Sequence, residues 1–336
     1  MTLHEAIQRA THQLDAVPDL RADAARDAAL LLRHALAITR AQQLAHPARP
    51  LTPAEVSAYE ALIARRLRSE PIQYITGEQE FYGLALAVTP AVLIPRPETE
   101  HLVESVLTEL ANSRSPQQDC HSNENCHSER SEESPHFLRS AKNPRSGEKI
   151  RILDIGTGSG AIAIALAHHL PQAHVTAVDL SLAALEVAAT NAARHGLSDR
   201  IRFVQSNLLA ALAADSDAPP FDAPESPTSG LNSLKFDAIV SNPPYVPDSD
   251  RASLHPQVRD HEPSTALFAG PDGLDIYRRL IPQARAALAS GGLLALEIGQ
   301  GQRDSIAALL NDWTEVRFVD DLQRIPRVAL ARKPQA

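Results

Sequence analysis

The sequence predicts an α/β protein in which a small helical domain precedes a doubly wound, mainly parallel sheet. Three observations support this fold class. From residue 150 onward, short apolar segments typical of strands alternate with helical segments, as in parallel sheets with crossover helices. Residues 2–69 instead carry apolar side chains at helical spacing. A glycine-rich turn at residues 154–160 joins the first strand of the alternating region to its helix, where such sheets bind ligands.

Residues 1–70 are expected to form the helical domain. Apolar side chains recur on one helix face at Leu3, Ala6, Ile7, Ala10 and Leu14. A later helix has a clear start, because Thr52 can cap it, Pro53 suits its first position and Glu55 completes a capping box. We expect this helix to extend to about Arg68, since Pro71 disfavours helical backbone in the residue before it.

Residues 71–97 are expected to form a β-hairpin linker between the two domains. Aromatic residues and glycines are mixed at 73–77 and 80–83, and residues 84–88 alternate weakly between the two faces of a strand. Residues 98–336 then form the larger domain, which begins with a helix from His101 to about Ala111.

The alternating region gives a definite set of expected elements. Strands are predicted at 150–153, 175–178, 201–204, 237–240, 293–298, 316–319 and 327–331, and helices at 161–170, 182–195, 276–289 and 303–310. Two segments have almost no apolar side chains to bury, and we predict disordered inserts at 113–149 and 214–234. Cys120 and Cys126 lie in the first of them, each followed by a histidine, at a spacing that matches no common zinc site, so we predict no metal.

Composition narrows the protein class. The chain has 336 residues, 43% of them hydrophobic, and no apolar run approaches the roughly 18–20 residues that a membrane helix needs. The first residues lack the apolar core of a secretory signal, and two cysteines fit a reducing compartment, so a cytoplasmic protein is expected. A net charge of −9 disfavours non-specific binding of nucleic acid, which needs clustered Lys and Arg. We expect a monomer that binds neither nucleic acid nor membrane.

The run Asn242-Pro243-Pro244-Tyr245 is the most informative motif. It follows a short apolar strand, and two prolines cannot continue a sheet, so Asn242 is predicted to stand at the carboxyl end of that strand. Asn242 Oδ1 and the Pro243 carbonyl can both accept hydrogen bonds from one NH2 group, and the Tyr245 ring can lie against its plane. Taken alone, the motif is equally consistent with an ordinary loop turn.

A second group of residues predicts a nucleotide site. The turn Gly156-Thr157-Gly158-Ser159-Gly160 permits a tight bend and a close approach of backbone to ligand, and its spacing differs from that of phosphate-cradling loops. Asp179 ends the next strand, where an acidic side chain commonly binds ribose hydroxyls. The alternative for Asp179 is a helix cap before Ser181. Asn207 follows the third strand as a candidate adenine contact, with Leu208 available to cover the ring.

These motifs together resemble class I S-adenosylmethionine-dependent methyltransferases that act on an amino or amide nitrogen. Further motifs are similar to the HemK/PrmC family, namely Glu70-Pro71 with Tyr74 and Gly77, Phe81-Tyr82-Gly83, the stretch LIPRPETE at 93–100, Glu262-Pro263 with Ala266-Leu267, and Gly273-Leu274 with Tyr277. The resemblance covers nearly the whole chain except the two inserts. It implies a Rossmann-like, doubly wound sheet of seven strands, with S-adenosylmethionine bound by the glycine turn, Asp179, Asn207, Leu208 and Asn242.

The resemblance also implies an activity. Family members methylate the glutamine side chain, at N5, in the Gly-Gly-Gln motif of peptide chain release factors. Asn242, Pro243 and Tyr245 would then be catalytic, the whole run from Asn242 to Tyr245 would bind substrate, and residues 1–70 would recognise the release factor. This chain departs from the family by its insert at 113–149 and by Leu208, where some members carry an aromatic residue.

Two other functions remain open from the sequence. A nucleic-acid adenine-N6 or other amino methyltransferase shares the Asn-Pro-Pro-Tyr motif and would require a basic cleft beside it. A catalytically inactive binding module is the other alternative, against which the intact Asn242, Gly156, Gly158 and Asp179 argue.

Overall fold

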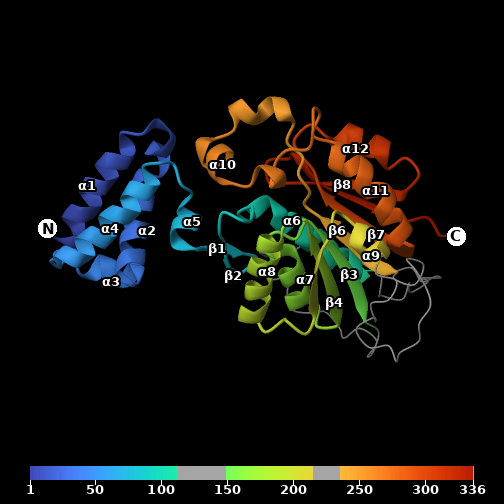
Figure 1. Cartoon of the computed structure of the whole chain (residues 1–336), viewed down its shortest axis with the longest axis horizontal. Coiled ribbons are helices and arrows are strands. Elements are labelled where there is room, and N and C mark those ends of the chain that lie inside the picture. Colours follow the sequence, from blue (N-terminus) through green and yellow to red (C-terminus); the bar gives the residue numbers. More distant parts are fainter. Residues whose placement is uncertain (113–148, 215–234, 336) are drawn as a thin grey trace, which may run out of the picture.

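The structure, a computed structural model, describes residues 1–112, 149–214 and 235–335. The two predicted inserts, with Cys120 and Cys126, therefore lie almost entirely outside the described residues. A bundle of helices forms one end of the molecule and a domain built on a sheet forms the other, with a narrow linker between them (Figure 1).

The helical domain matches its sequence pattern. It consists of α1 (Leu3–Asp15), the 3-10 helix η1 (Pro18–Asp23), α2 (Ala24–Leu36), α3 (Arg40–Ala45) and α4 (Pro53–Arg66). The predicted capping box of α4 is confirmed, because the Thr52 side chain accepts from the Glu55 amide while the Glu55 carboxylate accepts from the Thr52 amide. Leu14, Leu31 and Leu32 are fully buried in its core. This domain thus has a hydrophobic core of its own.

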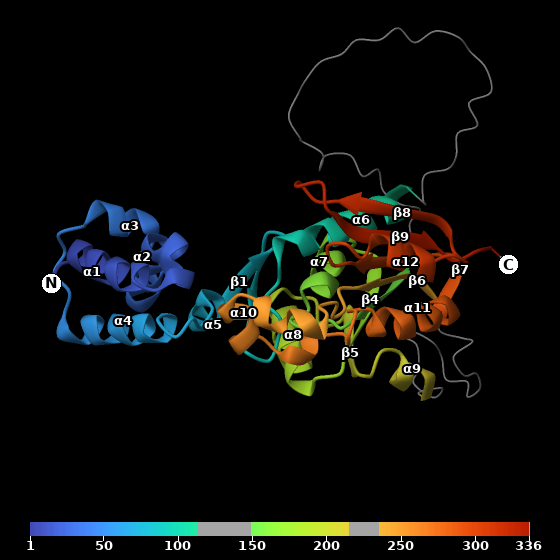
Figure 2. The same cartoon turned by 90° about the horizontal axis from the view of Figure 1, so that it is seen from above.

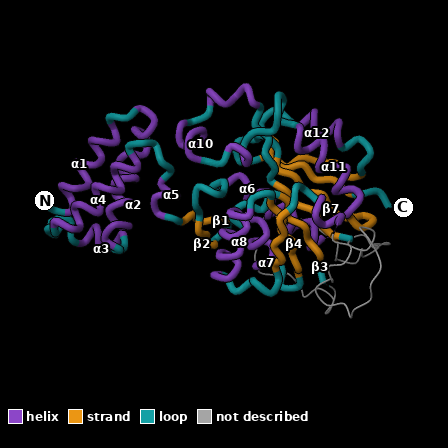
Figure 3. The backbone as a smooth tube through the Cα atoms, in the orientation of Figure 1, coloured by secondary structure: helices purple, strands orange, loops and turns teal. Residues whose placement is uncertain are grey.

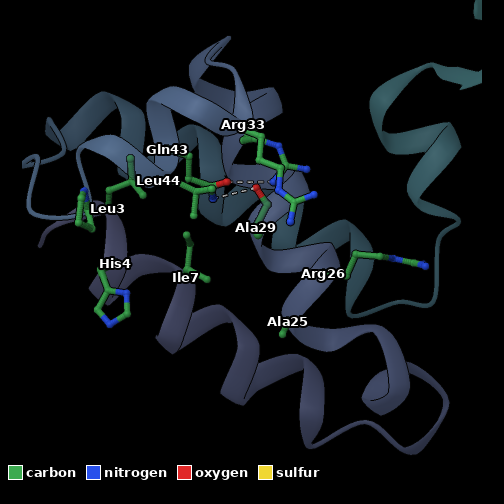
Figure 4. A pocket seen from close by; sticks show the side chains of 11 residues that line it. Leu3, His4, Ile7, Ala25, Arg26, Ala29, Arg33, Gln43 and Leu44 are labelled. Atoms are coloured by element: carbon green, nitrogen blue, oxygen red, sulfur yellow. Dashed lines mark hydrogen bonds between the residues drawn. The ribbon is translucent and has the colours of Figure 1, made fainter.

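A cavity of about 470 Å³ opens among α1, α2 and α3 of this domain (Figure 4). Apolar side chains such as Ile7 and Leu44 share its lining with Arg26, Arg33 and Arg40. A hydrogen bond of 2.9 Å from Arg33 Nη1 to Gln43 Oε1 crosses one side of it. None of the site residues predicted from the sequence lines this cavity.

The linker differs from the hairpin predicted for residues 71–97. It begins with a helix, α5 (Ile72–Thr76), and only β1 (Glu78–Phe81) and β2 (Leu84–Ala87) form the antiparallel hairpin. Gly77, with φ of +78°, ends α5 in the left-handed conformation typical of a helix C-terminus. Tyr74, an aromatic residue typical of strands, made this segment resemble part of the hairpin. It is instead buried on α5, where its hydroxyl donates to the Val92 carbonyl at 2.5 Å.

The larger domain contains a seven-stranded sheet in the order β5-β4-β3-β6-β7-β9-β8. The strands are β3 (Ile150–Ile155), β4 (Ala173–Asp179), β5 (Ile201–Gln205), β6 (Phe236–Ser241), β7 (Leu288–Glu297), β8 (Thr314–Asp320) and β9 (Pro326–Arg332). All neighbours pair in parallel except β9, which is antiparallel to β7 and β8. Figure 3 shows these strands together at the centre of the domain. The predicted doubly wound, seven-stranded sheet is confirmed.

Helices cover both faces of this sheet (Figure 2). The helices α6 (Pro97–Asn112), α7 (Ala161–His169) and α8 (Leu182–Arg194) pack on one face, and α11 (Asp275–Ala287) and α12 (Arg303–Leu309) pack on the other. Residues 161–167 of α7 are all buried, which explains why this segment is apolar on every side. A short helix, α9 (Ala210–Ala214), was not predicted.

The connection from β6 to α11 also contains elements that the sequence did not predict. These are η2 (Asp248–Ser253), α10 (Pro256–His261) and η3 (Ser264–Ala266). In Figures 1 and 2, α10 lies beside the linker, toward the helical domain. The ring Nε2 of His255 lies 3.2 Å from the Asp19 carbonyl and that of His261 lies 3.0 Å from the Arg68 carbonyl. This connection therefore contacts both domains.

Candidate active site

The Asn-Pro-Pro-Tyr turn follows directly after β6, as predicted. The strand ends at Ser241, whose buried hydroxyl donates to the Ile155 carbonyl at 2.7 Å and so ties the ends of β6 and β3 together. The two prolines after Asn242 have no amide donors and cannot continue the ladder. Asn242 therefore stands at the carboxyl edge of the sheet, close to the end of β3.

A cavity of about 480 Å³ opens at this edge. Its lining comes from the segment before α6 and from its first turn (residues 90–93, 95, 96 and 99), from the end of β3 and beyond (155–159, 161 and 162), and from the end of β4 and beyond (178–181, 183 and 184). Residues 206–208 after β5, 241–244 at the end of β6 and beyond, and 263, 265, 266 and 276 complete it. The carboxyl ends of four neighbouring parallel strands thus contribute to one cavity, as expected for a ligand site in an open α/β sheet. Gly156, Thr157, Gly158, Ser159, Asp179, Asn207, Leu208, Asn242, Pro243 and Pro244 all line it, so most of the predicted site residues are brought together.

The glycine turn owes its shape to glycines with positive φ. Gly156 and Gly158, with φ of +73° and +56°, adopt a left-handed backbone that side chains strain. Gly160 does not line the cavity, and its contribution is to helix packing. A Cβ on it would lie 3.0 Å from Ile164 Cδ1 and 3.1 Å from Ala188 Cβ, so it lets α7 approach α8 closely. The prediction that Gly160 contacts a cofactor has no support from this position.

Asp179 holds the turn from the end of β4. Its Oδ2 accepts from the Gly158 amide and its Oδ1 from the Ser181 amide, both at 2.9 Å. The helix cap of α8 is Ser181, whose hydroxyl accepts from the Ala184 amide. Asp179 thus braces both the glycine turn and the start of α8 while it lines the cavity. The alternative prediction, that Asp179 itself caps α8, is wrong, because the cap is Ser181.

Asp154 is a buried acid that the sequence reading did not select as a site residue. It lies directly before the glycine turn, and the Thr157 hydroxyl donates to its Oδ2 at 2.7 Å. Burial raises the pKa of Asp154 to about 7, against the opposing effect of the hydrogen bond from Thr157. Within the described chain its Oδ1 has no hydrogen-bond partner. In the sequence, the feature that could have indicated Asp154 as a site residue is its position, an acid near the end of an otherwise apolar strand.

Asn207 and Leu208 line the cavity after β5. Asn207 Oδ1 accepts a hydrogen bond of 2.8 Å from Arg279 Nη2 on α11. Leu208 has φ of +54°, a conformation that is uncommon for a residue with a side chain and that occurs at ligand sites. The exposed side chain of Leu180, after β4, also contributes to the lining. Two apolar side chains are therefore available to cover a flat ring.

Asn242 is held by a residue that the sequence analysis did not identify. Its Nδ2 donates to Thr99 Oγ1 at 3.1 Å, and Thr99 is a buried residue in the first turn of α6. Among the described residues none donates a hydrogen bond to Asn242 Oδ1. Thr99 belongs to the stretch LIPRPETE, which the sequence analysis identified as a family motif. The contact of its side chain with Asn242 was not predicted.

Tyr245 differs from its predicted position. It is absent from the cavity lining, and its ring packs close to Gly299, where a Cβ would lie 3.0 Å from Tyr245 Cδ2. Its hydroxyl lies 3.4 Å from Glu297 Oε1, and its carbonyl accepts from Gln302 Nε2 at 3.0 Å. Burial raises the pKa of the Tyr245 phenol well above its ordinary value. The ring therefore lies behind the turn, because glycine at 299 leaves it room there.

An ion pair holds Arg96, which lines the cavity. Arg96 pairs with Glu262, whose other oxygen accepts from the Ile94 amide at 3.3 Å. Burial raises the pKa of Glu262, although Arg96 favours its ionised form. Both residues belong to motifs noted in the sequence, and together they join the segment before α6 to the connection after α10.

Two sequence families match this chain. The PrmC N-terminal domain family matches residues 5–77, and a methyltransferase domain family matches residues 146–297. The chain is 40% identical to the release factor glutamine methyltransferase of Koribacter versatilis over 99% of both chains. It is also 40% identical to the protein of the same name from Bradyrhizobium diazoefficiens, over 93% of this chain and 89% of that one.

The chain belongs to the release factor glutamine methyltransferase family. A third relative with this name, from Moorella thermoacetica, is 40% identical over 92% of this chain. The methyltransferase domain and the family together imply S-adenosylmethionine as the methyl donor.

In the parts of the chain that the structure describes, no helix is long and apolar enough to span a membrane, and no three acidic, His or Cys side chains gather as a metal site would need.

Proposed function

We propose that this protein transfers the methyl group of S-adenosylmethionine to the side-chain nitrogen, N5, of the glutamine in the Gly-Gly-Gln motif of peptide chain release factors. Family membership supports the substrate class. The observation that carries the chemistry is the anchoring of Asn242, whose Nδ2 is bound to Thr99. This leaves its Oδ1, at the cavity edge, as an acceptor for an NH2 group.

The cavity residues fit the donor that the family implies. S-adenosylmethionine supplies an electrophilic methyl group on a sulfonium. We infer that the backbone of Gly156, Thr157, Gly158 and Ser159 approaches its amino-acid part, because these residues line the cavity and the two glycines carry no side chain to block a close approach. Asp179 has its carboxylate in the lining, where it can accept from ribose hydroxyls. Leu208 and Leu180 would cover the adenine, with Asn207 at its edge.

The chain's contribution to the reaction is to position an amide nitrogen. Such a nitrogen is a weak nucleophile, since its lone pair is delocalised into the carbonyl. We propose that Asn242 Oδ1 and the Pro243 carbonyl each accept one N–H of the glutamine side chain. These hydrogen bonds strengthen as the nitrogen becomes pyramidal and positively charged, so they stabilise the transition state more than the ground state. The product amide loses its proton after the transfer, so no strong base is needed beforehand.

We propose a revised role for Tyr245. Its position behind the turn supports an anchoring function, in which the ring and hydroxyl hold the Asn242–Pro244 segment at the cavity edge from the side of β7. Pro244 lines the cavity and remains in the proposed substrate contact. A stacking contact of the Tyr245 ring with the substrate amide would require the ring to leave the place that Gly299 provides.

We further propose that residues 1–70 recognise the release factor and that the protein acts as a cytoplasmic monomer.

The adenine-N6 alternative receives little support from the cavity. Within the described chain, Arg96 is the one basic side chain in its lining, and it is paired with Glu262. A nucleic-acid enzyme would need unpaired Lys or Arg side chains around the same edge. The binding-module alternative is disfavoured by the assembled residues at the carboxyl edge.

The test uses labelled S-adenosylmethionine with three substrates in parallel: a release factor, the same factor with the Gly-Gly-Gln glutamine replaced by alanine, and double-stranded DNA. We expect label only in the unaltered release factor, at the glutamine. Label in DNA would establish the alternative instead. Binding of the methyl donor without transfer to any of the three would favour the binding module.

A further inference from the structure

The loop of residues 246–269, which contains α10, is anchored at both of its ends beside the Asn-Pro-Pro-Tyr turn. It leaves the turn at Val246, directly after Tyr245. The Val246 amide donates to the Leu267 carbonyl at 2.9 Å, and the Ala269 amide donates to the Val246 carbonyl at 3.0 Å. The middle of this α10 loop lies beside the linker, toward the helical domain (Figure 1). The loop thus extends from the turn that carries Asn242 to the other domain.

A histidine stands at each end of α10 and binds the helical domain. His255 caps the helix, since its Nδ1 accepts from the Gln257 amide at 3.3 Å. The proton of the neutral ring is therefore on Nε2, which lies 3.2 Å from the Asp19 carbonyl and donates to it. His261 ends the helix, and its Nε2 donates to the Arg68 carbonyl at 3.0 Å. Asp19 belongs to η1 and Arg68 follows α4, so the two bonds reach different elements of the helical domain.

The next residues of the α10 loop belong to the cavity. Glu262, directly after His261, pairs with Arg96, and Pro263 lines the cavity. Neither His255 nor His261 is part of the lining. The loop is therefore bound to the helical domain through its two histidines and to the cavity wall through the residues that follow them.

The linker gives the helical domain a separate attachment to the sheet domain. Its helix α5 packs against α2 and α4, and Tyr74 on α5 donates to the Val92 carbonyl. Domains joined through one narrow connection are free to move relative to each other unless further contacts hold them. A body held at one place can rotate about it, whereas attachments at several places fix its orientation. The two histidines of the α10 loop provide such attachments.

We propose that His255 and His261 are positioning residues that hold the helical domain in a fixed orientation relative to the Asn-Pro-Pro-Tyr turn. A release factor bound by the helical domain thereby meets Asn242 at a preset distance, and the rotational freedom of the domain is removed before the substrate arrives. Neither histidine touches the reacting groups. This inference rests on the proposed function, because it takes residues 1–70 as the domain that recognises the release factor.

The kinetic test uses the full-length protein and the double variant His255→Ala/His261→Ala. We expect KM for the release factor to rise about 3- to 10-fold, as for loss of two hydrogen bonds with modest net contributions. Both kcat at saturating release factor and the dissociation constant of S-adenosylmethionine should stay within about twofold. An unchanged KM, or a fall in kcat without a rise in KM, would overturn the proposal.

Two further variants separate positioning from general damage to the loop. His255→Gln/His261→Gln keeps an N–H donor at each position and should restore KM to within about twofold. Gln257→Ala is the matched control on the same helix, because its side chain forms no hydrogen bond with other described residues. It should leave KM unchanged. A KM that rises equally in the control and in the alanine double variant would refute the assignment to the histidines.

A second measurement follows the domain orientation without catalysis. Gln8→Cys and Thr190→Cys place spin labels at exposed positions on α1 and α8, in a background with both native cysteines replaced by serine. Pulsed electron paramagnetic resonance should give one narrow distance distribution, which broadens in the alanine double variant and stays narrow in the glutamine double variant. Equal widths in all three would refute the inference even if the release factor is methylated. Broadening in a protein that transfers no methyl group to the release factor would support the fixed orientation and contradict the proposed function alone.

Discussion

Asn242 and Thr99 lie 143 positions apart in the sequence and are joined by a hydrogen bond of 3.1 Å from Nδ2 to Oγ1. One side chain follows a strand of the sheet and the other stands in the first turn of a helix that packs across it. The pairing holds the Asn242 amide by its nitrogen. Its importance can be tested from either side of the bond and from the groups around it.

Removal of the Asn242 side chain should affect turnover rather than donor binding. For Asn242→Ala we expect kcat to fall by about 10²-fold or more, as for loss of a preorganised polar partner of the transition state. The dissociation constant of S-adenosylmethionine should change by no more than a few-fold. Thr190→Ala, at an exposed position on α8, serves as a control. Turnover near the wild-type rate in Asn242→Ala would refute the catalytic assignment.

Asp179→Ala should have the opposite profile. If its carboxylate accepts from ribose hydroxyls as proposed, this substitution should weaken S-adenosylmethionine binding about 10- to 100-fold, since hydrogen bonds to charged groups contribute about 1.5–3 kcal/mol each. Isothermal titration calorimetry measures this directly. Asp199→Ala, which removes an exposed carboxylate after α8, is the matched control and should bind normally. Unchanged affinity in Asp179→Ala would exclude the ribose contact.

The rate should depend on the ionisation of Glu297. Burial raises its pKa to about 7; Thr99, Tyr245 and Arg327 oppose this rise, and Glu98 adds to it. Since the ionised carboxylate accepts from the Tyr245 hydroxyl and so supports the turn after β6, kcat should rise with pH through about 7. Glu297→Gln should lower kcat and remove this rise. The comparison variant is Asp154→Asn, which deletes the other buried acid; a rise that disappears in this variant instead would assign the titration to Asp154.

Asp154 should make stability depend on pH. Its pKa is raised from 3.8 to about 7 by burial, so between these values the folded chain binds the proton more tightly than the unfolded chain does. The contribution to the free energy of unfolding is present below about pH 4 and is lost as pH rises through about 7. Urea unfolding should show a smaller decline with pH in Asp154→Asn, by an amount on the order of a few kcal/mol at most. An unaltered slope would mean that Asp154 titrates near its ordinary pKa.

The Arg96–Glu262 pair should contribute measurable stability. Arg96→Ala leaves the Glu262 carboxylate buried without its counter-charge, and we expect a loss of about 1–3 kcal/mol in the free energy of unfolding, because Arg96 itself is partly exposed. Arg259→Ala removes a pair with Asp260 at the surface, where water screens the two charges, and should have a clearly smaller effect. Equal effects of the two substitutions in urea unfolding would contradict the importance of burial.

The sequence predicted the sheet domain well because its signals are local. Each strand from β3 to β9 was placed within about two residues except β7, since a short apolar segment between turns has few other interpretations. Strand β7 begins at Leu288, whereas the sequence predicted a helix up to residue 289 and a strand only from residue 293. The exceptions have local reasons too. Tyr74 made a short helix look like a strand, and the segment of α10 is rich in polar residues and has no apolar periodicity.

The candidate site was predictable where position along a strand decides function. Asp179 ends a parallel strand and Asn242 directly follows one, and both line the cavity. Thr99 and Glu297 could not be predicted in the same way, because their importance comes from contacts that only the folded chain creates. Glu297 carried a faint signal, a charged residue at the end of the apolar run Leu293–Leu296. The place of Tyr245 depends on Gly299, 54 positions later, which no local pattern reveals.

The position of β7 has a consequence for folding. This strand pairs with β6, which leads to Asn242, and with β9 near the C-terminus. The contact of Glu297 with the Tyr245 hydroxyl supports the turn after β6 only once β7 has docked. A chain that stopped before β7 would therefore hold this turn on one side only, through Thr99.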